Sequence, residues 1–89
     1  MKKIVEVQEV EGEGLTALLG EKVILFCLNY IYTGKLVGVN ASCVLLNDAA
    51  IVYETGAFYQ AKFKDAQKLS HPHYIQTSAI ESFAKTSQE

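Results

Sequence analysis

Lysine and aromatic side chains gather between residues 58 and 68, and they are the residues of this chain best suited to contact a ligand. Lys62, Lys64 and Lys68 are interleaved with Tyr59 and Phe63. Aromatic rings stack on nucleobases and cations attract the phosphate backbone, so this mixture is typical of surfaces that bind single-stranded nucleic acid. The same mixture also occurs where aromatic residues pack a loop onto a core. The residues alone leave both interpretations open.

Other chemistry-bearing residues lack the partners that catalysis or metal binding needs. His71 and His73 flank Pro72, and Cys27 and Cys43 stand alone in apolar contexts without CxxC or His-rich spacing. Such isolated groups do not make a metal site. No Ser/His/Asp or Cys/His arrangement, carboxylate pair or glycine-rich phosphate loop is recognisable. We therefore expect no enzyme, no metal and no cofactor.

Charge and hydropathy exclude further classes of function. The net charge is -2, and all eight basic residues are lysine. Proteins that grip duplex DNA show a basic balance and arginine forks, so we expect no duplex DNA as a partner. No stretch approaches the roughly 20 apolar residues of a membrane span. Glu6 and Glu9 interrupt any signal-peptide core after the basic start, and the prediction is a cytoplasmic protein.

The run from residue 21 to residue 54 organises the chain. It is rich in Val, Ile, Leu and Tyr, lacks proline, and is divided by polar residues into expected strands at 22–30, 31–40 and 43–54. Gly34 and Gly38 lie within the second strand, where glycine marks a bend or a close backbone approach. The pattern predicts a small, strongly curved antiparallel sheet that closes into a barrel.

The flanking segments complete a single domain over residues 1–89. Residues 1–13 form an acidic arm, interpreted as a solvated flap or as an acidic recognition tail. Leucines at helical spacing before Gly20 predict a short helix that lies over the barrel. Segment 55–73 is a variable excursion whose helix or strand character periodicity does not decide. Two short strands, 74–78 and 79–83, and a polar tail at 84–89 that frays complete the chain.

The central strands are apolar on both faces, which is more than a one-sided small sheet needs. Val23, Leu25 and Cys27 alternate with Ile24, Phe26 and Leu28, so neither face of this strand is polar. We expect self-association to cover the excess apolar surface.

The segment from residue 14 to residue 83 resembles the Sm-like family. The first motif of that family runs glycine, any residue, aliphatic, two variable residues, hydrophobic, aspartate, and Gly34, Leu36, Val39 and Asn40 stand at those places. The following VNASCVLLND has the spacing of the bacterial Hfq branch. Residues 79–82 are similar to the end of the second motif.

This resemblance implies a short N-terminal helix followed by a strongly bent five-stranded antiparallel β-barrel. It also implies a homo-oligomeric ring of about six or seven subunits, in which the fourth strand of one subunit pairs with the fifth of the next. Ile75, Ile80 and Phe83 would then lie at or near the subunit interface. Single-stranded RNA is the partner that the family usually binds.

The residues at the family's RNA pocket depart from its pattern. Ser42 stands at the stacking position, and Thr77 and Ser78 stand where the family has a cation-containing pair. Asn40 alone keeps a related polar group. Two functions therefore remain open: a ring that binds RNA through a non-standard surface, including the lysines of 62–68, or a ring that has lost RNA and serves as a structural or protein-binding scaffold.

Overall fold

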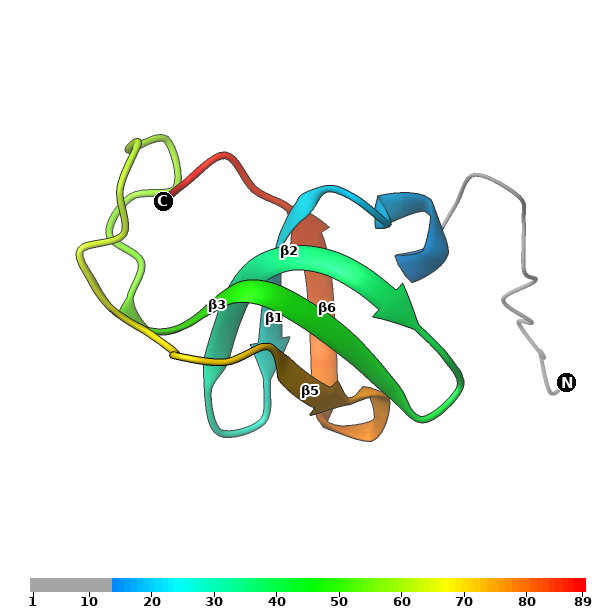
Figure 1. Ribbon diagram of the computed structural model, residues 1–89. Coiled ribbons are helices and arrows are strands. Elements are labelled where there is room, and N and C mark those ends of the chain that lie inside the picture. Colours follow the sequence, from blue (N-terminus) through cyan, green and yellow to red (C-terminus); the bar gives the residue numbers. More distant parts are fainter. Residues whose placement is uncertain (1–13) are drawn as a thin grey trace, which may run out of the picture.

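The computed structural model describes residues 14–89, and they fold as one antiparallel sheet of six strands (Figure 1). The predicted acidic arm at 1–13 lies outside the described residues. Two short 3-10 helices accompany the strands: η1 (Leu15–Leu18) precedes the first strand, and η2 (Thr77–Ala79) lies between the last two. The strands are β1 (Lys22–Cys27), β2 (Ile31–Val39), β3 (Cys43–Glu54), β4 (Asp65–Lys68), β5 (His73–Gln76) and β6 (Ile80–Lys85).

The sheet order is β4-β3-β2-β1-β6. β5 also pairs with β3, further along the same strand than β4. The structure therefore differs from the predicted five-stranded barrel, because it has six strands and the sheet is not closed. β4 pairs with the second half of β3 around Val52, and β5 pairs with its first half around Val44. Residues 69–72, which include Pro72, separate these two short strands and account for the additional one.

Two irregularities bend β2 against β3. Their register shifts between Thr33 and Lys35 and again between Leu36 and Gly38. A Cβ atom at Gly34 would lie 2.9 Å from the carbonyl oxygen of Asn47, so only glycine fits where the strands approach this closely. β2 and β3 curve together over β1 and β6 as a result (Figure 1).

The expected N-terminal helix is a single 3-10 turn, η1, and no α-helix forms there. Gly14 and Gly20 bound it with positive φ angles of 77° and 87°. The backbone N–H of Gly20 donates to the carbonyl oxygen of Leu36 at 2.7 Å, so the chain leaves the turn by joining β2. The five residues between the two glycines are too few to offset the cost of nucleating an α-helix.

Both faces of the sheet carry buried apolar residues. Val23 and Leu25 of β1 belong to the larger cluster on one face, and Ile24 belongs to a smaller cluster on the other face with Val52 and Phe63. The full larger cluster is Val23, Leu25, Leu36, Val44, Leu46, Ala49 and Ile75.

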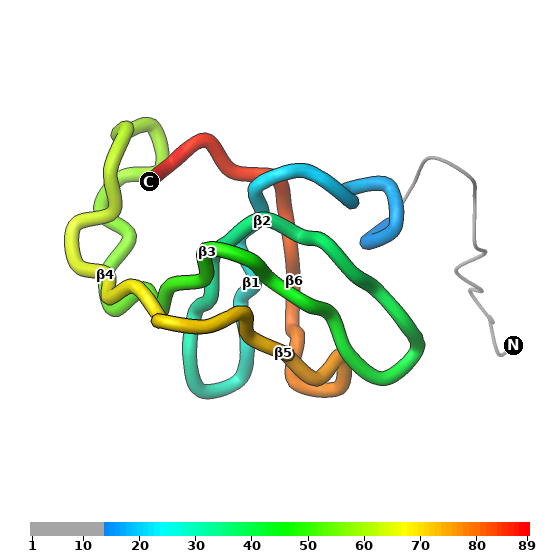
Figure 2. The backbone as a smooth tube through the Cα atoms, in the orientation of Figure 1, coloured from blue at the N-terminus to red at the C-terminus, as the bar shows by residue number. Residues whose placement is uncertain are grey.

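The polar tail packs against the chain, so the prediction that it frays is wrong. The end of the chain runs beside the loop that follows β3 (Figure 2). The backbone N–H of Glu89 donates to Ala61 O at 2.9 Å, and the N–H of Phe63 donates to Glu89 O at 2.8 Å. Gln88 is buried, and its Nε2 donates to the carbonyl oxygens of Thr55 and Ala57, each at 3.2 Å. These bonds hold the loop and the tail over the smaller cluster.

Candidate functional site

The turn between β2 and β3 is held by one side chain. Asn40 Oδ1 accepts hydrogen bonds from the backbone N–H groups of Ser42 at 2.8 Å and Cys43 at 2.9 Å, and from Ser42 Oγ at 3.0 Å. An asparagine side chain that caps the following N–H groups is a common way to stabilise a tight turn. The side-chain oxygen of Asn40, which the family resemblance assigns to ligand binding, therefore already has hydrogen-bond partners within the chain.

This turn is bonded to the start of η2. The backbone N–H of Thr77 donates to Ser42 O at 2.9 Å, and Thr77 Oγ1 donates to Ala41 O at 2.9 Å. Ser42, Thr77 and Ser78 line a common cavity of about 580 Å³, and Asn40 holds the adjoining turn. The four residues predicted from the two motifs thus come together. We call this cavity the turn pocket; its lining residues are Ala41, Ser42, Cys43, Tyr74, Gln76, Thr77 and Ser78.

Tyr74 supplies an aromatic ring to the turn pocket that the sequence reasoning did not include. It is 69% exposed, whereas its neighbour Ile75 is buried in the larger core cluster. The strand alternation was the available signal, because a buried Ile75 places Tyr74 on the opposite side of β5. No lysine lines this pocket.

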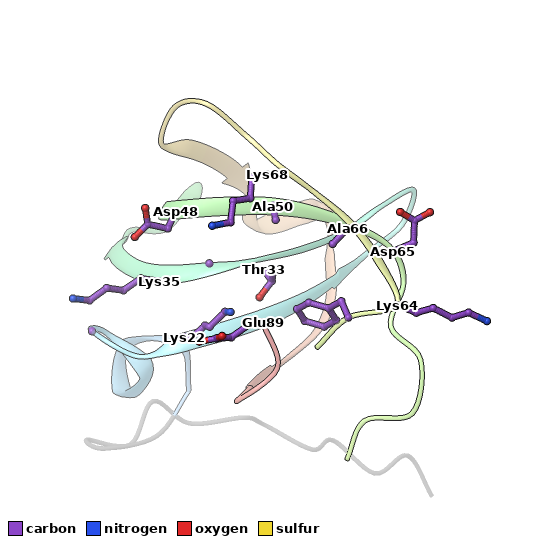
Figure 3. A pocket seen from close by; sticks show the side chains of 13 residues that line it. Lys22, Thr33, Lys35, Asp48, Ala50, Lys64, Asp65, Ala66, Lys68 and Glu89 are labelled. Atoms are coloured by element: carbon purple, nitrogen blue, oxygen red, sulfur yellow. The ribbon is translucent and has the colours of Figure 1, made fainter. Parts of the chain in front are cut away.

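A second cavity, of about 700 Å³, lies over the face of the sheet that carries the smaller core cluster, and Phe63 of that cluster lines it (Figure 3). Lys22 of β1, Lys35 of β2 and Lys68 of β4 come together here although they are distant in sequence. We call this cavity the lysine cleft. Its lining residues are Gly20, Lys22, Thr33, Gly34, Lys35, Asp48, Ala50, Phe63, Lys64, Asp65, Ala66, Lys68 and Glu89.

The lysine and aromatic residues predicted as a group are only partly together in this cleft. Lys64, Lys68 and Phe63 line it, whereas Lys62 and Tyr59 do not. Phe63 is 9% exposed and packs in the smaller core cluster, so its ring anchors the loop. Tyr59 is 90% exposed, and Lys64 Nζ lies 3.3 Å from Glu54 Oε1.

The sequence did not predict that Lys22 and Lys35 belong to a site, because their proximity depends on strand pairing. They are direct partners in the β1–β2 register. Given the strand boundaries, the turn length between β1 and β2 would have been the signal.

The candidate interface residues have different environments. Ile75 lies inside the larger core cluster, and Ile80 is half-buried against it. Phe83 is 40% exposed on β6, the strand at one end of the sheet. Of the three, Phe83 offers the most apolar surface outside the chain's own core.

Burial and packing set the environment of the two cysteines and of His73. Both thiols are free and half-buried, and burial raises the pKa of the Cys27 thiol, which keeps it protonated and a poor nucleophile. Burial likewise raises the pKa of Tyr32, whose ring stacks on His73 with ring centroids 5.8 Å apart. Over residues 14–89, His, Cys, Asp and Glu form no group of three that is able to hold a metal ion.

Within the same residues, both helices are single turns, and neither has the length and apolar character that crossing a membrane requires. A scan against protein-family models found no match, and a search of curated proteins found none either.

Proposed function

We propose that this chain is an Sm-like protein that binds single-stranded RNA at the turn pocket and assembles into a homo-oligomeric ring. The observation that carries the proposal is that Ser42, Thr77 and Ser78 line one cavity, while Asn40 holds the turn beside it. The resemblance assigns these positions to the RNA pocket of the family. Asn40 and Ser42 lie on the β2–β3 turn, and Thr77 and Ser78 lie on η2, more than thirty residues later in the sequence.

The chemistry of the turn pocket suits a nucleobase better than a phosphate. The exposed ring of Tyr74 offers a stacking face, and base stacking on an aromatic side chain contributes about 1–3 kcal/mol. The hydroxyl of Ser78 and the amide of Gln76 are available to hydrogen-bond the base edge. Since no cation lines the pocket, base contacts rather than charge pairing supply the affinity.

The ends of the sheet support the assembly part of the proposal. β6 pairs only with β1, and β5 pairs only with β3, among the described residues. Each of these strands therefore has one edge whose N–H and C=O groups lack a strand partner. Such edges pair readily with another chain, and ring closure satisfies all of them at once.

RNA binding is tested by fluorescence anisotropy with short U-rich, A-rich and mixed oligoribonucleotides at low salt. We expect the Tyr74→Ala variant to lose about tenfold or more in affinity, the equivalent of one lost stacking contact. Tyr53→Ala is the matched control, because Tyr53 is 55% exposed and does not line the turn pocket. Equal affinity of the two variants, or no binding by the unmodified protein, contradicts the RNA proposal.

Assembly is tested by light scattering on the unmodified chain. A single species of about six or seven subunits is expected for a closed ring of this kind. A strict monomer at all concentrations contradicts the ring, and it leaves the anisotropy result to be judged by itself.

A scaffold without RNA is the second candidate, and one observation favours it. Asn40 Oδ1 and Thr77 Oγ1 are both bonded within the chain, so two of the predicted ligand-binding groups serve the fold. A ring that forms by light scattering and yet binds none of the oligonucleotides supports this function.

A further inference from the structure

We propose that the lysine cleft binds a phosphate-bearing ligand of mononucleotide size, at a site separate from the turn pocket. The cleft lies next to the smaller core cluster, on a part of the sheet face that the loop and the tail leave uncovered. Phe63 and the C-terminal tail close one part of this sheet face. Beyond them, the cavity is bounded by the buried backbone and small side chains of Thr33, Gly34 and Ala50.

Small residues at the base of the cleft leave room for a ligand. Thr33 and Ala50 are register partners on β2 and β3, and they are 3% and 7% exposed. The cavity measures about 700 Å³, within the range of roughly 300–1,000 Å³ that small-molecule sites occupy. Thr33 Oγ1 donates to Val23 O at 2.9 Å, so the base of the cleft is fixed by a buried hydrogen bond.

The lysines of the cleft repel one another in the free protein. Lys22 and Lys35 stand directly opposite each other in the β1–β2 ladder, and like charges at such positions destabilise a sheet. Lys22, Lys35 and Lys68 have no carboxylate within 4.0 Å among residues 14–89, where the ion pairs are Lys64–Glu54 and Lys85–Glu21. A bound anion would relieve this repulsion.

The carboxylates of the cleft narrow the chemistry of the ligand. Asp48, Asp65 and Glu89 line the same cavity as the lysines. Lys22 and Lys68 lie on opposite sides of Thr33 (Figure 3). Asp48 and Glu89 lie at the same end of the cleft as these lysines, whereas Asp65 lies toward the other end (Figure 3). These carboxylates would repel a polymer that carries negative charge along its whole length.

A mononucleotide satisfies both kinds of group. Its phosphomonoester accepts hydrogen bonds from the lysines, and its ribose hydroxyls or base amines donate to the carboxylates. The Asp48 backbone has a φ angle of 50°, in the left-handed region that aspartate adopts more readily than most residues, and Asp48 lines the wall of the cleft. The phosphate has two sources, a free nucleotide or the terminal nucleotide of an RNA strand.

Binding is measured by calorimetry with adenosine and uridine monophosphates, the matching nucleosides and inorganic phosphate. We expect the nucleotides to bind at least tenfold more tightly than the nucleosides. The Lys22→Gln/Lys35→Gln and Lys68→Gln variants should each lose at least tenfold in affinity. Lys62→Gln, outside the cleft, should bind as the unmodified protein does. Equal affinity for nucleotide and nucleoside, no heat at millimolar nucleotide, or unchanged binding by both cleft variants overturns the proposal.

Oligoribonucleotides with a 5′-phosphate or a 5′-hydroxyl distinguish the two sources. A preference for the phosphorylated strand that disappears in the Lys22→Gln/Lys35→Gln variant assigns the site to RNA ends. Nucleotide binding without such a preference assigns it to the free ligand. Tyr74→Ala should leave nucleotide affinity unchanged, so the cleft and the turn pocket fail or succeed separately.

Discussion

The turn pocket and the lysine cleft differ in whether their polar groups have partners within the chain. At the turn pocket, Asn40 Oδ1 accepts three hydrogen bonds and Thr77 donates two to the facing turn. At the lysine cleft, two lysines face each other across neighbouring strands and have no carboxylate within 4.0 Å among residues 14–89. The first arrangement stabilises the fold and the second costs stability.

This difference separates structural polar residues from those available to a ligand. A side chain whose hydrogen bonds are made within the chain contributes to the free energy of folding, and replacing that side chain lowers the stability of the protein. A charge that is held near a like charge opposes folding, and a counter-charge that binds there lowers its energy. Replacing the bonded polar side chains of the turn pocket should therefore lower stability, whereas replacing one of the facing lysines of the cleft should raise it.

The two glycines of β2 provide the largest expected contrast, since Gly34 lines the cleft and Gly38 lies near the turn. A Cβ at Gly34 would meet backbone atoms of Asn47 and Ala49 at 2.9 and 3.2 Å. A Cβ at Gly38 would meet the Leu45 side chain at 3.4 Å, an ordinary contact. We expect Gly34→Ala to lower the free energy of unfolding by about 3 kcal/mol, as overpacking does. Gly38→Ala should leave it unchanged or raise it by less than about 1 kcal/mol.

Urea denaturation of both variants measures this contrast. Similar midpoints for Gly34→Ala and Gly38→Ala would mean that the backbone beside the cleft adjusts freely. The view of the cleft base as a rigid platform would then be wrong.

Gln88 tests whether the closed part of the cleft face depends on the tail. It is 1% exposed and donates from Nε2 to the carbonyl oxygens of Thr55 and Ala57. Removing both hydrogen bonds with Gln88→Ala should cost about 2 kcal/mol, because two carbonyl groups lose their donor. Gln60→Ala, at an exposed position of the same loop, is the control and should cost less than about 0.5 kcal/mol. A tail that detaches without any loss of stability would give the two variants equal thermal midpoints.

Asn40 tests the structural character of the turn pocket. Asn40→Ala removes the acceptor of three hydrogen bonds, and we expect a loss of about 1 kcal/mol because water replaces part of the bonding at this exposed turn. Asn40→Asp keeps the acceptor oxygen and should recover most of the stability. Asn29→Ala, at an exposed position in the β1–β2 connection, is the matched control. If Asn40→Ala and Asn29→Ala have the same stability by urea denaturation, the polar group of Asn40 is available to a ligand after all.

The sequence predicted the regions where local pattern and burial agree. β3 runs from Cys43 to Glu54, as expected from its apolar residues and the polar turn before it. β1 ends earlier than predicted, at Cys27, because the N–H of Cys27 donates to Tyr30 O and the connection turns there. A local pattern locates a strand better than it locates the strand's last residue.

Long-range pairing decided the features that sequence reasoning missed. β4 has four exposed residues and no apolar alternation, so only its ladder with β3 makes it a strand. The tail reads as polar and terminal, yet Gln88 finds two carbonyl groups about thirty residues earlier. The facing of Lys22 and Lys35 likewise follows from the strand register. Composition carries none of this information.

The smallest expected effect is a gain in stability at the lysine cleft. Lys35→Glu places a carboxylate opposite Lys22 in the β1–β2 ladder, replacing repulsion with attraction. Cross-strand charge pairs contribute roughly 0.2–1 kcal/mol, so we expect the free energy of unfolding to rise by about 0.5 kcal/mol. The gain should shrink as sodium chloride is added, because these side chains face solvent. Lys62→Glu, outside the cleft, changes the net charge equally and should give no comparable gain.

Since Lys35→Glu also removes a phosphate-binding cation, its nucleotide affinity should fall while its stability rises. A variant that loses stability and keeps its nucleotide affinity would show that Lys35 serves the fold, and the contrast between the two regions would not hold.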